Sequence, residues 1–211
     1  DQDGMYAVSP LSAPPAADEP APPAGASHFE PRFSSSYFAL YGDPLLAPLD
    51  DSFPDGYLER LARSGADGVW IQAVLYRLAP FPWQPARSDR YGERLKQLGA
   101  LVERARSHGL GVYLYLNEPR TMPASFFKEH PELRGVDENG YATLCTSVPE
   151  VRQWLRDSVA TVCRAVPDLA GVFTISASEN LTTCWSHFGG AKCPRCAGRG
   201  GAEVIADLHA A

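Results

Sequence analysis

The hydrophobic pattern of the chain alternates between short apolar runs and longer stretches of helical periodicity. The apolar runs that predict strands occupy residues 33–40, 68–75, 111–116 and 171–177. Each is followed by a stretch with apolar residues at helical spacing, in residues 55–64, 88–108, 147–166 and 203–209. Because the last three runs are apolar at nearly every position, we expect parallel strands that are covered on both faces.

This alternation predicts an α/β fold of the (β/α) TIM-barrel type, with about four βα units that form a partial barrel. A Gly-Val pair opens three of the four runs, at residues 68–69, 111–112 and 171–172, as expected for a repeated unit. A complete eight-unit barrel takes about 250 residues, and the chain has 211. We therefore expect the N-terminal half of a longer barrel, or a half that associates with a partner. The alternative is an open doubly wound sheet, although no Gly-rich phosphate loop follows any run.

Composition indicates where the ordered domain begins and which classes of partner it disfavours. Residues 10–25 hold six prolines, which predicts a Pro/Ala-rich linker or disordered tail over residues 1–28. The partial barrel, a catalytic-type domain, is then expected over residues 29–211. A net charge of −6 and the lack of a Lys/Arg run argue against nucleic acid as a partner. No apolar run reaches the roughly 18 residues of a membrane span.

The N-terminal residues show no basic start followed by an apolar core, so no secretory signal is visible. The compartment therefore cannot be read from the sequence. A metal motif of reduced cysteines would favour the cytoplasm.

A group of metal-ligand residues lies near the C-terminal end of the sequence. It has the spacing Cys-x2-His-x5-Cys-x2-Cys, formed by Cys184, His187, Cys193 and Cys196. Four such ligands suit a closed tetrahedral zinc site, which would be structural. Cys145 could replace His187 as the fourth ligand. The alternatives are buried thiols beside a surface histidine, or a Cys-x-x-Cys redox centre.

Polar and aromatic residues follow the predicted strands, where a barrel places its active site. Aromatic faces stack on pyranose rings, while amides, carboxylates and guanidinium groups bind sugar hydroxyls. The expected sugar-binding residues are Asp43, Gln72, Tyr76, Arg77, Asn117, Glu118, Arg120 and Asn180. Glu118 could instead form an ion pair with Arg120, and Asp43 could belong to an ordinary turn.

Glu179 follows the fourth strand and is the candidate general acid/base. Glycosidic cleavage needs a carboxyl group that gives a proton to the leaving oxygen. The alternative roles for Glu179 are a helix cap or a carboxylate behind the metal ligands.

On these residues the chain resembles the (β/α)8-barrel glycoside hydrolases, over residues 29–211 in pattern and most sharply over residues 171–196. In many of these enzymes strand four ends in Asn-Glu, or in Asp-Glu in the hexosaminidase-like group. Ser178-Glu179 shares the Glu and differs at the preceding residue. The β-galactosidase family 42 is similar in that a zinc-binding cysteine cluster closely follows this Glu.

The resemblance implies an O-glycosyl hydrolase in its full length, with Glu179 as acid/base and a carbohydrate as substrate. The nucleophile of the retaining relatives follows strand seven, so we expect the 211-residue chain alone to be inactive or nearly so. Its partner could be the C-terminal half of the barrel or a second copy. The alternative is a non-catalytic module that binds carbohydrate or protein and uses the zinc-binding segment as its interaction surface. A metal-dependent isomerase or lyase barrel is disfavoured, because no histidine lies at the ends of the first three strands.

Overall fold

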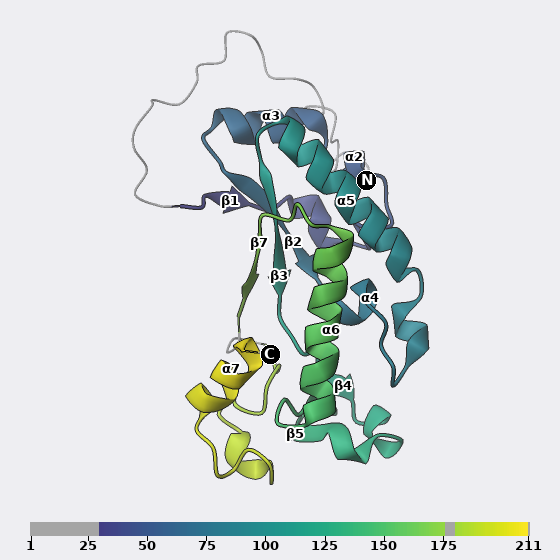
Figure 1. Ribbon diagram of the computed structural model, residues 1–211, viewed down its shortest axis with the longest axis vertical. Helices are drawn as coiled ribbons and strands as arrows, with labels where there is room; N and C mark the ends of the chain where they lie inside the picture. Colours follow the sequence, from purple (N-terminus) through teal and green to yellow (C-terminus); the bar gives the residue numbers. More distant parts are fainter. Residues whose placement is uncertain (1–29, 176–179, 211) are drawn as a thin grey trace, which may run out of the picture. The chain divides into compact units, whose positions relative to one another are not determined.

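The computed structural model describes residues 30–175 and 180–210 of the chain (Figure 1). The predicted tail, residues 1–28, and the candidate acid/base Glu179 lie outside these ranges. The described residues divide into two compact units. The first comprises residues 30–72, Gly92–Tyr115 and Ala165–Val172, and the second comprises Ala73–Tyr91, Leu116–Arg164 and the described part of Phe173–Ala211.

Short strands and intervening helices make up both units. The strands are β1 (Phe33–Ser34), β2 (Gly68–Ala73), β3 (Gly111–Leu116), β4 (Met122–Pro123), β5 (Arg134–Glu138), β6 (Tyr141–Leu144) and β7 (Gly171–Thr174). The α-helices are α2 (Leu49–Ser52), α3 (Asp55–Arg63), α4 (Leu75–Leu78), α5 (Tyr91–Ser107), α6 (Pro149–Ala165) and α7 (Gly201–His209). The 3-10 helices are η1 (Tyr37–Leu40), η2 (Pro85–Ser88), η3 (Phe126–Lys128), η4 (Pro131–Leu133) and η5 (Gly190–Lys192). No helix in the described part of the chain is long and apolar enough to cross a membrane.

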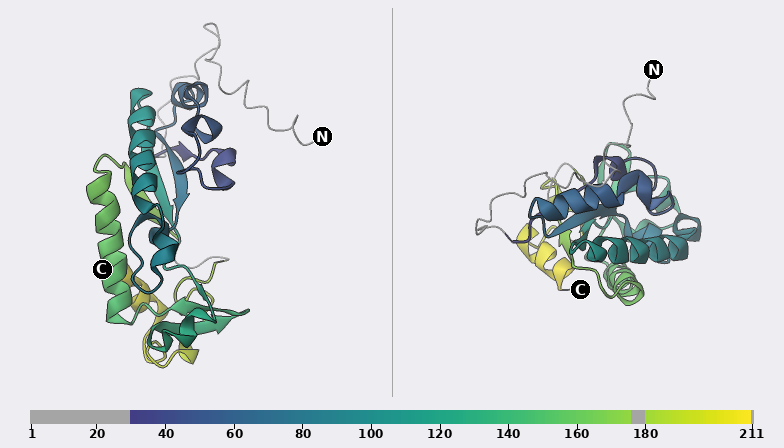
Figure 2. Two further views of the ribbon diagram at one scale, coloured as in Figure 1. Left: turned by 90° about the vertical axis from the view of Figure 1, so that its right-hand side faces the viewer. Right: turned by 90° about the horizontal axis from the view of Figure 1, so that it is seen from above.

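The larger sheet has the strand order β1-β2-β3-β7, and β1 pairs with β2 in parallel, Phe33 opposite Gly68. Helices separate these strands along the chain, and α5 runs beside β2 and β3 in the left-hand view of Figure 2. Neighbouring strands of a (β/α) barrel follow one another in this sequential way, whereas a doubly wound sheet reverses its strand order. The fold class predicted from the sequence, α/β with four βα units in a partial barrel, is confirmed.

The repeated Gly-Val strand starts have a packing explanation in the first unit. A Cβ atom on Gly68 would lie 2.8 Å from Cε2 of Tyr113, and one on Gly171 would lie 3.2 Å from the same ring. The glycines thus leave room for the Tyr113 ring, which also contacts Phe33 at 4.8 Å between centroids. Val69 and Val112, the residues that follow two of the glycines, are fully buried.

The second unit contains a small antiparallel sheet of order β4-β6-β5. Between β5 and β6 the chain turns at Asn139 and Gly140, whose φ angles of 51° and 81° are those of a two-residue hairpin turn. Residues 139–140 therefore form the hairpin that joins β5 to β6. Helix α6 buries Val151, Trp154, Leu155, Ser158 and Val162.

The predicted strands over residues 33–40, 68–75 and 171–177 end earlier in the structure, the last of them at Thr174. The first run continues after β1 as the 3-10 helix η1, in which Tyr37 lies four residues before Tyr41 and their hydroxyls hydrogen-bond. The second run ends at Ala73. Helix α4 begins at Leu75, whose N–H donates a hydrogen bond to the carboxylate of Glu118, two residues after β3.

Candidate metal centre and strand-end site

Four cysteines of the second unit converge on one point. Their sulfur atoms all lie within 4.8 Å of one another, and their side chains are at most 1% exposed. Cys145 directly follows β6, Cys184 lies in the segment after β7, and Cys193 and Cys196 follow η5. The group can therefore hold a metal ion with ligands from three parts of the chain.

The sulfur–sulfur distances decide between a disulfide and a metal site. Cys145 Sγ lies 3.7 Å from Cys193 Sγ and 3.7 Å from Cys196 Sγ. A disulfide would bring two sulfurs to about 2.05 Å, and all four cysteines are free thiols. Four thiolates at about 2.3 Å from a tetrahedral metal would stand about 3.8 Å apart. The two distances from Cys145 Sγ thus match those of a tetrahedral thiolate site, and the remaining sulfur separations are at most 4.8 Å.

Neighbouring groups fit closely around the thiols. Thr143 Oγ1 lies 3.3 Å from Cys184 Sγ, and Ser147 Oγ lies 3.3 Å from Cys196 Sγ. These hydroxyls can donate hydrogen bonds to thiolates and hold them in place. Gly135 is needed at its position, because a Cβ there would lie 2.6 Å from Cys184 Sγ.

The thiols of the cluster influence one another's ionisation. Hydrogen bonds from Cys184 and Arg195 lower the pKa of Cys145 from its ordinary value. The same contact with Cys145, together with burial, raises the pKa of Cys184. A thiolate at Cys145 beside the Arg195 guanidinium is the form that binds a cation.

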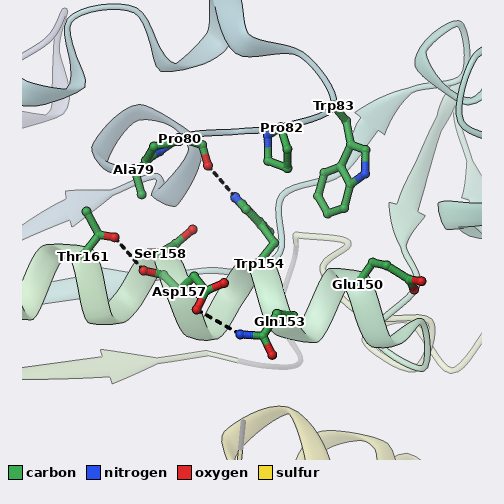
Figure 3. A pocket seen from close by; sticks show the side chains of 10 residues that line it. All are labelled: Ala79, Pro80, Pro82, Trp83, Glu150, Gln153, Trp154, Asp157, Ser158 and Thr161. Atoms are coloured by element: carbon green, nitrogen blue, oxygen red, sulfur yellow. Dashed lines mark hydrogen bonds between the residues drawn. The ribbon is translucent and has the colours of Figure 1, made fainter.

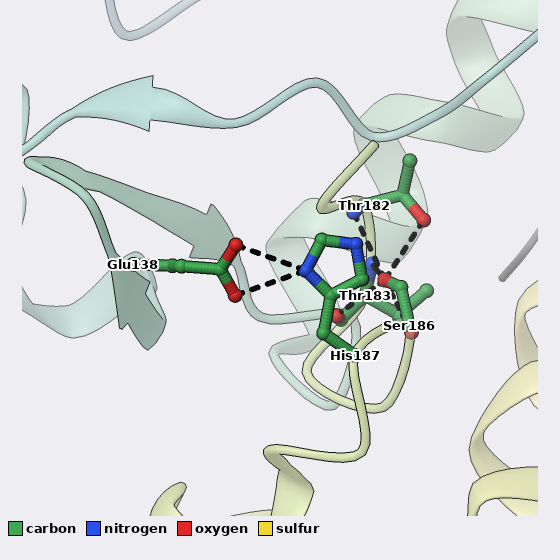
Figure 4. A network of polar contacts seen from close by, with 5 residues as sticks. All are labelled: Glu138, Thr182, Thr183, Ser186 and His187. Atoms are coloured by element: carbon green, nitrogen blue, oxygen red, sulfur yellow. Dashed lines mark hydrogen bonds and ion pairs between the residues drawn. The ribbon is translucent and has the colours of Figure 1, made fainter. Parts of the chain in front are cut away.

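His187 is not a member of this cluster, so the fourth position goes to Cys145, the alternative that the sequence left open. The imidazole Nδ1 of His187 instead lies 3.0 and 2.9 Å from the two carboxylate oxygens of Glu138 (Figure 4). In the preceding turn, the Ser186 hydroxyl accepts hydrogen bonds from the N–H groups of Thr182 and Thr183. This turn directs Cys184 inward and His187 toward β5.

Glu118 connects the ends of β2 and β3 in the second unit. Its Oε1 accepts a hydrogen bond of 2.8 Å from the N–H of Leu75, and its Oε2 accepts one of 2.9 Å from the N–H of Arg120. Burial nevertheless raises the pKa of Glu118 to about 7, against the lowering effect of these bonds and of the Arg120 charge. The group can therefore take up and release a proton near neutral pH.

Asn117 precedes Glu118 and is 0% exposed. Neither its amide nitrogen nor its amide oxygen has a hydrogen-bond partner in the described part of the chain, and the same holds for Arg120 Nε. Buried carboxamides are nearly always hydrogen-bonded, so an exception calls for a functional explanation. The sequence singled out these residues only by their place after a strand.

The remaining sugar-binding candidates fall into both units. In the second unit, Tyr76 lies in α4 under the guanidinium of Arg87, 5.4 Å from its ring centroid, Arg77 is exposed, and Asn180 is half-buried. In the first unit, Asp43 pairs with Arg94 at 2.8 Å, and Gln72 is exposed near the end of β2. The Asp43 pair was not foreseen, because the two residues lie far apart in sequence.

Comparison with known proteins gives similarity of structure only. No family model matches the chain, and no curated protein matches it in sequence. A maltogenic α-amylase from Thermotoga neapolitana superposes with a TM-score of 0.44 at 17% identity, over 71% of this chain and 39% of the amylase. A chitobiase from Flavobacterium johnsoniae superposes with a TM-score of 0.45 at 11% identity, over 85% of this chain and 28% of the chitobiase. The chain thus spans well under half the length of either enzyme.

Proposed function

We propose that the chain is a glycoside hydrolase-like domain that binds a carbohydrate at the carboxyl ends of its strands. Glu179 would be the general acid/base, and a structural zinc ion would be held by the four cysteines. The observation that carries this proposal is the pair Asn117–Glu118, directly after β3. Strand ends of this kind are where (β/α) barrels place their ligands.

The chemistry of this pair suits a sugar. Asn117 offers one buried donor group and one buried acceptor, both without partners among the described residues. A sugar hydroxyl can donate and accept at once, so a vicinal pair of hydroxyls would satisfy both amide atoms. Glu118, with a pKa of about 7, can meet a hydroxyl either as donor or as acceptor. Binding would thus offset the cost of a buried, unpaired amide.

The donor set supports zinc as the metal. Four thiolates in tetrahedral spacing suit zinc or an iron–sulfur cluster, and the 4.8 Å limit on the sulfur separations fits a single ion. With four protein ligands the site would be closed, so its role would be to hold the segment after β7 against β6. Elemental analysis of the purified chain should find about one zinc per chain; iron with a visible absorption band would contradict the assignment.

Carbohydrate binding is tested by calorimetric titration with a panel of neutral oligosaccharides, measured in the Trp83→Ala background so that a sugar stacked on the Trp83 indole does not contribute. We expect binding to at least one member of the panel. Asn117→Ala should weaken it by at least about tenfold, or 1.4 kcal/mol. Glu103→Gln, which changes an exposed carboxylate on α5, should leave it unchanged. No binding to any member by the folded protein would overturn the proposal.

A non-catalytic module is the second candidate, and two observations favour it. Both oxygens of Glu118 already accept backbone hydrogen bonds, as expected of a carboxylate with a structural role. Phe188, in the cysteine-rich segment, is 85% exposed with a φ of 58°, as expected for a residue presented to a partner. A cationic iminosugar separates the two, since it mimics the charge of a glycosidic transition state. If Glu179 is the acid/base, Glu179→Gln should weaken iminosugar binding more than binding of the neutral sugar; an equal effect would favour the module.

A further inference from the structure

A groove of about 510 Å³ runs along α6 in the second unit (Figure 3). One wall is a single face of the helix, formed by Glu150, Gln153, Trp154, Asp157, Ser158 and Thr161. These positions recur at the three- and four-residue spacing of one helical face. The other wall is the segment from Ala79 to Trp83. None of these residues belongs to the strand-end site or to the cysteine cluster.

The apolar part of the groove is held together by a hydrogen bond and by ring contacts. Trp154 Nε1 donates a hydrogen bond of 3.0 Å to the carbonyl oxygen of Pro80, which fixes the helix to the opposite wall. Trp83 is half-buried and meets Trp154 at 63° and Phe81 at 79° between ring planes. Both contacts are T-shaped, so neither neighbouring ring lies parallel to the Trp83 indole.

Polar groups line the helix wall. Gln153 donates from Nε2 to Asp157 Oδ1 at 2.9 Å, so its amide and the carboxylate are held side by side. Glu150, Gln153 and Asp157 are all exposed. Ser158 is different, because it is only 2% exposed and its Oγ has no partner in the described part of the chain. In Figure 3 this hydroxyl points from α6 toward the opposite wall.

We propose that this groove is a second carbohydrate site, which takes a pyranose ring without negative charge. The ring stacks on the Trp83 indole, and its hydroxyls bind the Asp157 carboxylate, the Gln153 amide and the Ser158 hydroxyl. An apolar platform flanked by a carboxylate, an amide and a hydroxyl matches the two faces of a sugar, one of C–H groups and one of hydroxyls. This site stands whether or not the strand-end site binds sugar.

Charge sets the class of sugar. Glu150 and Asp157 flank the groove, and among the described residues that line it none is basic. The guanidinium of Arg156, outside this lining, donates to Gln153 Oε1 at 3.4 Å. A uronic acid would place its carboxylate near these two acidic side chains, which repels it. A protonated amino sugar would be attracted, and a neutral sugar lies between the two. The order of affinity should therefore be amino sugar, neutral sugar, uronic acid.

The test measures binding in the Asn117→Ala background, in which the strand-end contribution is weakened. The probes are pentamers of glucose, N-acetylglucosamine, glucosamine and galacturonic acid, titrated by calorimetry at low salt. We expect binding of a neutral or amino pentamer that Trp83→Ala weakens by at least about tenfold. Since Trp83 also packs against Phe81 and Trp154, the exposed substitutions Gln153→Ala and Asp157→Asn provide a second measure, each expected to weaken binding severalfold.

Glu129→Gln, an exposed carboxylate of the same unit outside the groove, is the matched control and should change nothing. No binding in the Asn117→Ala background overturns the groove proposal. So does binding that survives Trp83→Ala and Gln153→Ala together, or a uronate pentamer that binds best. Binding that vanishes in Asn117→Ala but persists in Trp83→Ala would instead support the strand-end site and exclude the groove, so failures of the two proposals are distinguishable.

Discussion

The cysteine cluster and the strand-end pair, buried Asn117 with half-buried Glu118, are both polar sites of the second unit, yet they differ in how their atoms are satisfied. In the cluster, the sulfurs face one another within 4.8 Å and two hydroxyls lie at hydrogen-bond distance. At the strand end, Asn117 has no partner in the described residues for either amide atom. A site whose donors all point at one centre needs a single cation to become stable. A site with unpaired amide atoms needs a molecule that can both donate and accept.

The largest effect should come from removing a thiol of the cluster. Cys145→Ser should abolish metal binding and lower the melting temperature strongly, because metal binding contributes folding free energy of many kcal/mol in small structural sites. Metal content per chain and thermal unfolding with and without a chelator measure this. If Cys145→Ser still retains one metal per chain, Cys145 is not a ligand.

The close packing around the cluster predicts the next effect. A Cβ on Gly135 would meet Thr143 Oγ1 at 2.1 Å and Cys184 Sγ at 2.6 Å, so Gly135→Ala should cost about 1–3 kcal/mol and speed metal loss to a chelator. Gly99, inside α5, has open space around the same atom. Gly99→Ala should therefore stabilise the protein by about 0.5–1 kcal/mol. Equal effects of the two substitutions in denaturant unfolding would contradict the packing.

The strand-end pair should reveal itself through pH. Burial raises the pKa of Glu118 from 4.5 to about 7 in the folded protein, so the folded state keeps this proton longer than the unfolded state. Stability should then fall as pH rises from about 4.5 to about 7 and stay level above, by about 3 kcal/mol at most.

Glu118→Gln, which has no proton to lose, should lack this fall, and the exposed control Glu103→Gln should keep it. Unfolding free energies measured across the pH range decide the matter. A fall of equal size in Glu118→Gln would place the titrating group elsewhere.

The smallest effect concerns the ligand that the sequence motif suggested first. His187→Ala should leave the metal content unchanged, since the imidazole faces Glu138. Because both side chains of this pair are partly exposed, its loss should cost less than about 1 kcal/mol. A loss of metal in His187→Ala would show that His187 is a metal ligand, as Cys145 is expected to be.

Patterns local in sequence predicted the fold well. The strand over residues 111–116 and the helix over residues 147–166 depend on neighbouring residues, and both were placed to within two residues. Contacts between segments that are distant in sequence were harder to predict. The Cys145 thiol reaches the cluster only when the β5–β6 hairpin meets the segment after β7, so spacing alone favoured His187.

The same limit applies to burial. Nothing in the letters Asn117-Glu118 shows that the amide is enclosed or that the carboxyl pKa rises. The groove along α6 requires a loop about seventy residues earlier in the chain to fold against the helix. Both features depend on tertiary packing, which sets desolvation and cavity shape.

The position of Cys145 ahead of α6 has a consequence for how the chain is held together. Cys145 and Cys184 enclose α6 and β7 between them, so a metal bound by both would close this part of the chain into a ring. A protease that cuts once inside the ring would produce two pieces that still migrate as one particle on a sizing column. Adding a chelator would remove the metal that links the two pieces, and the pieces would then be held together only by their packing.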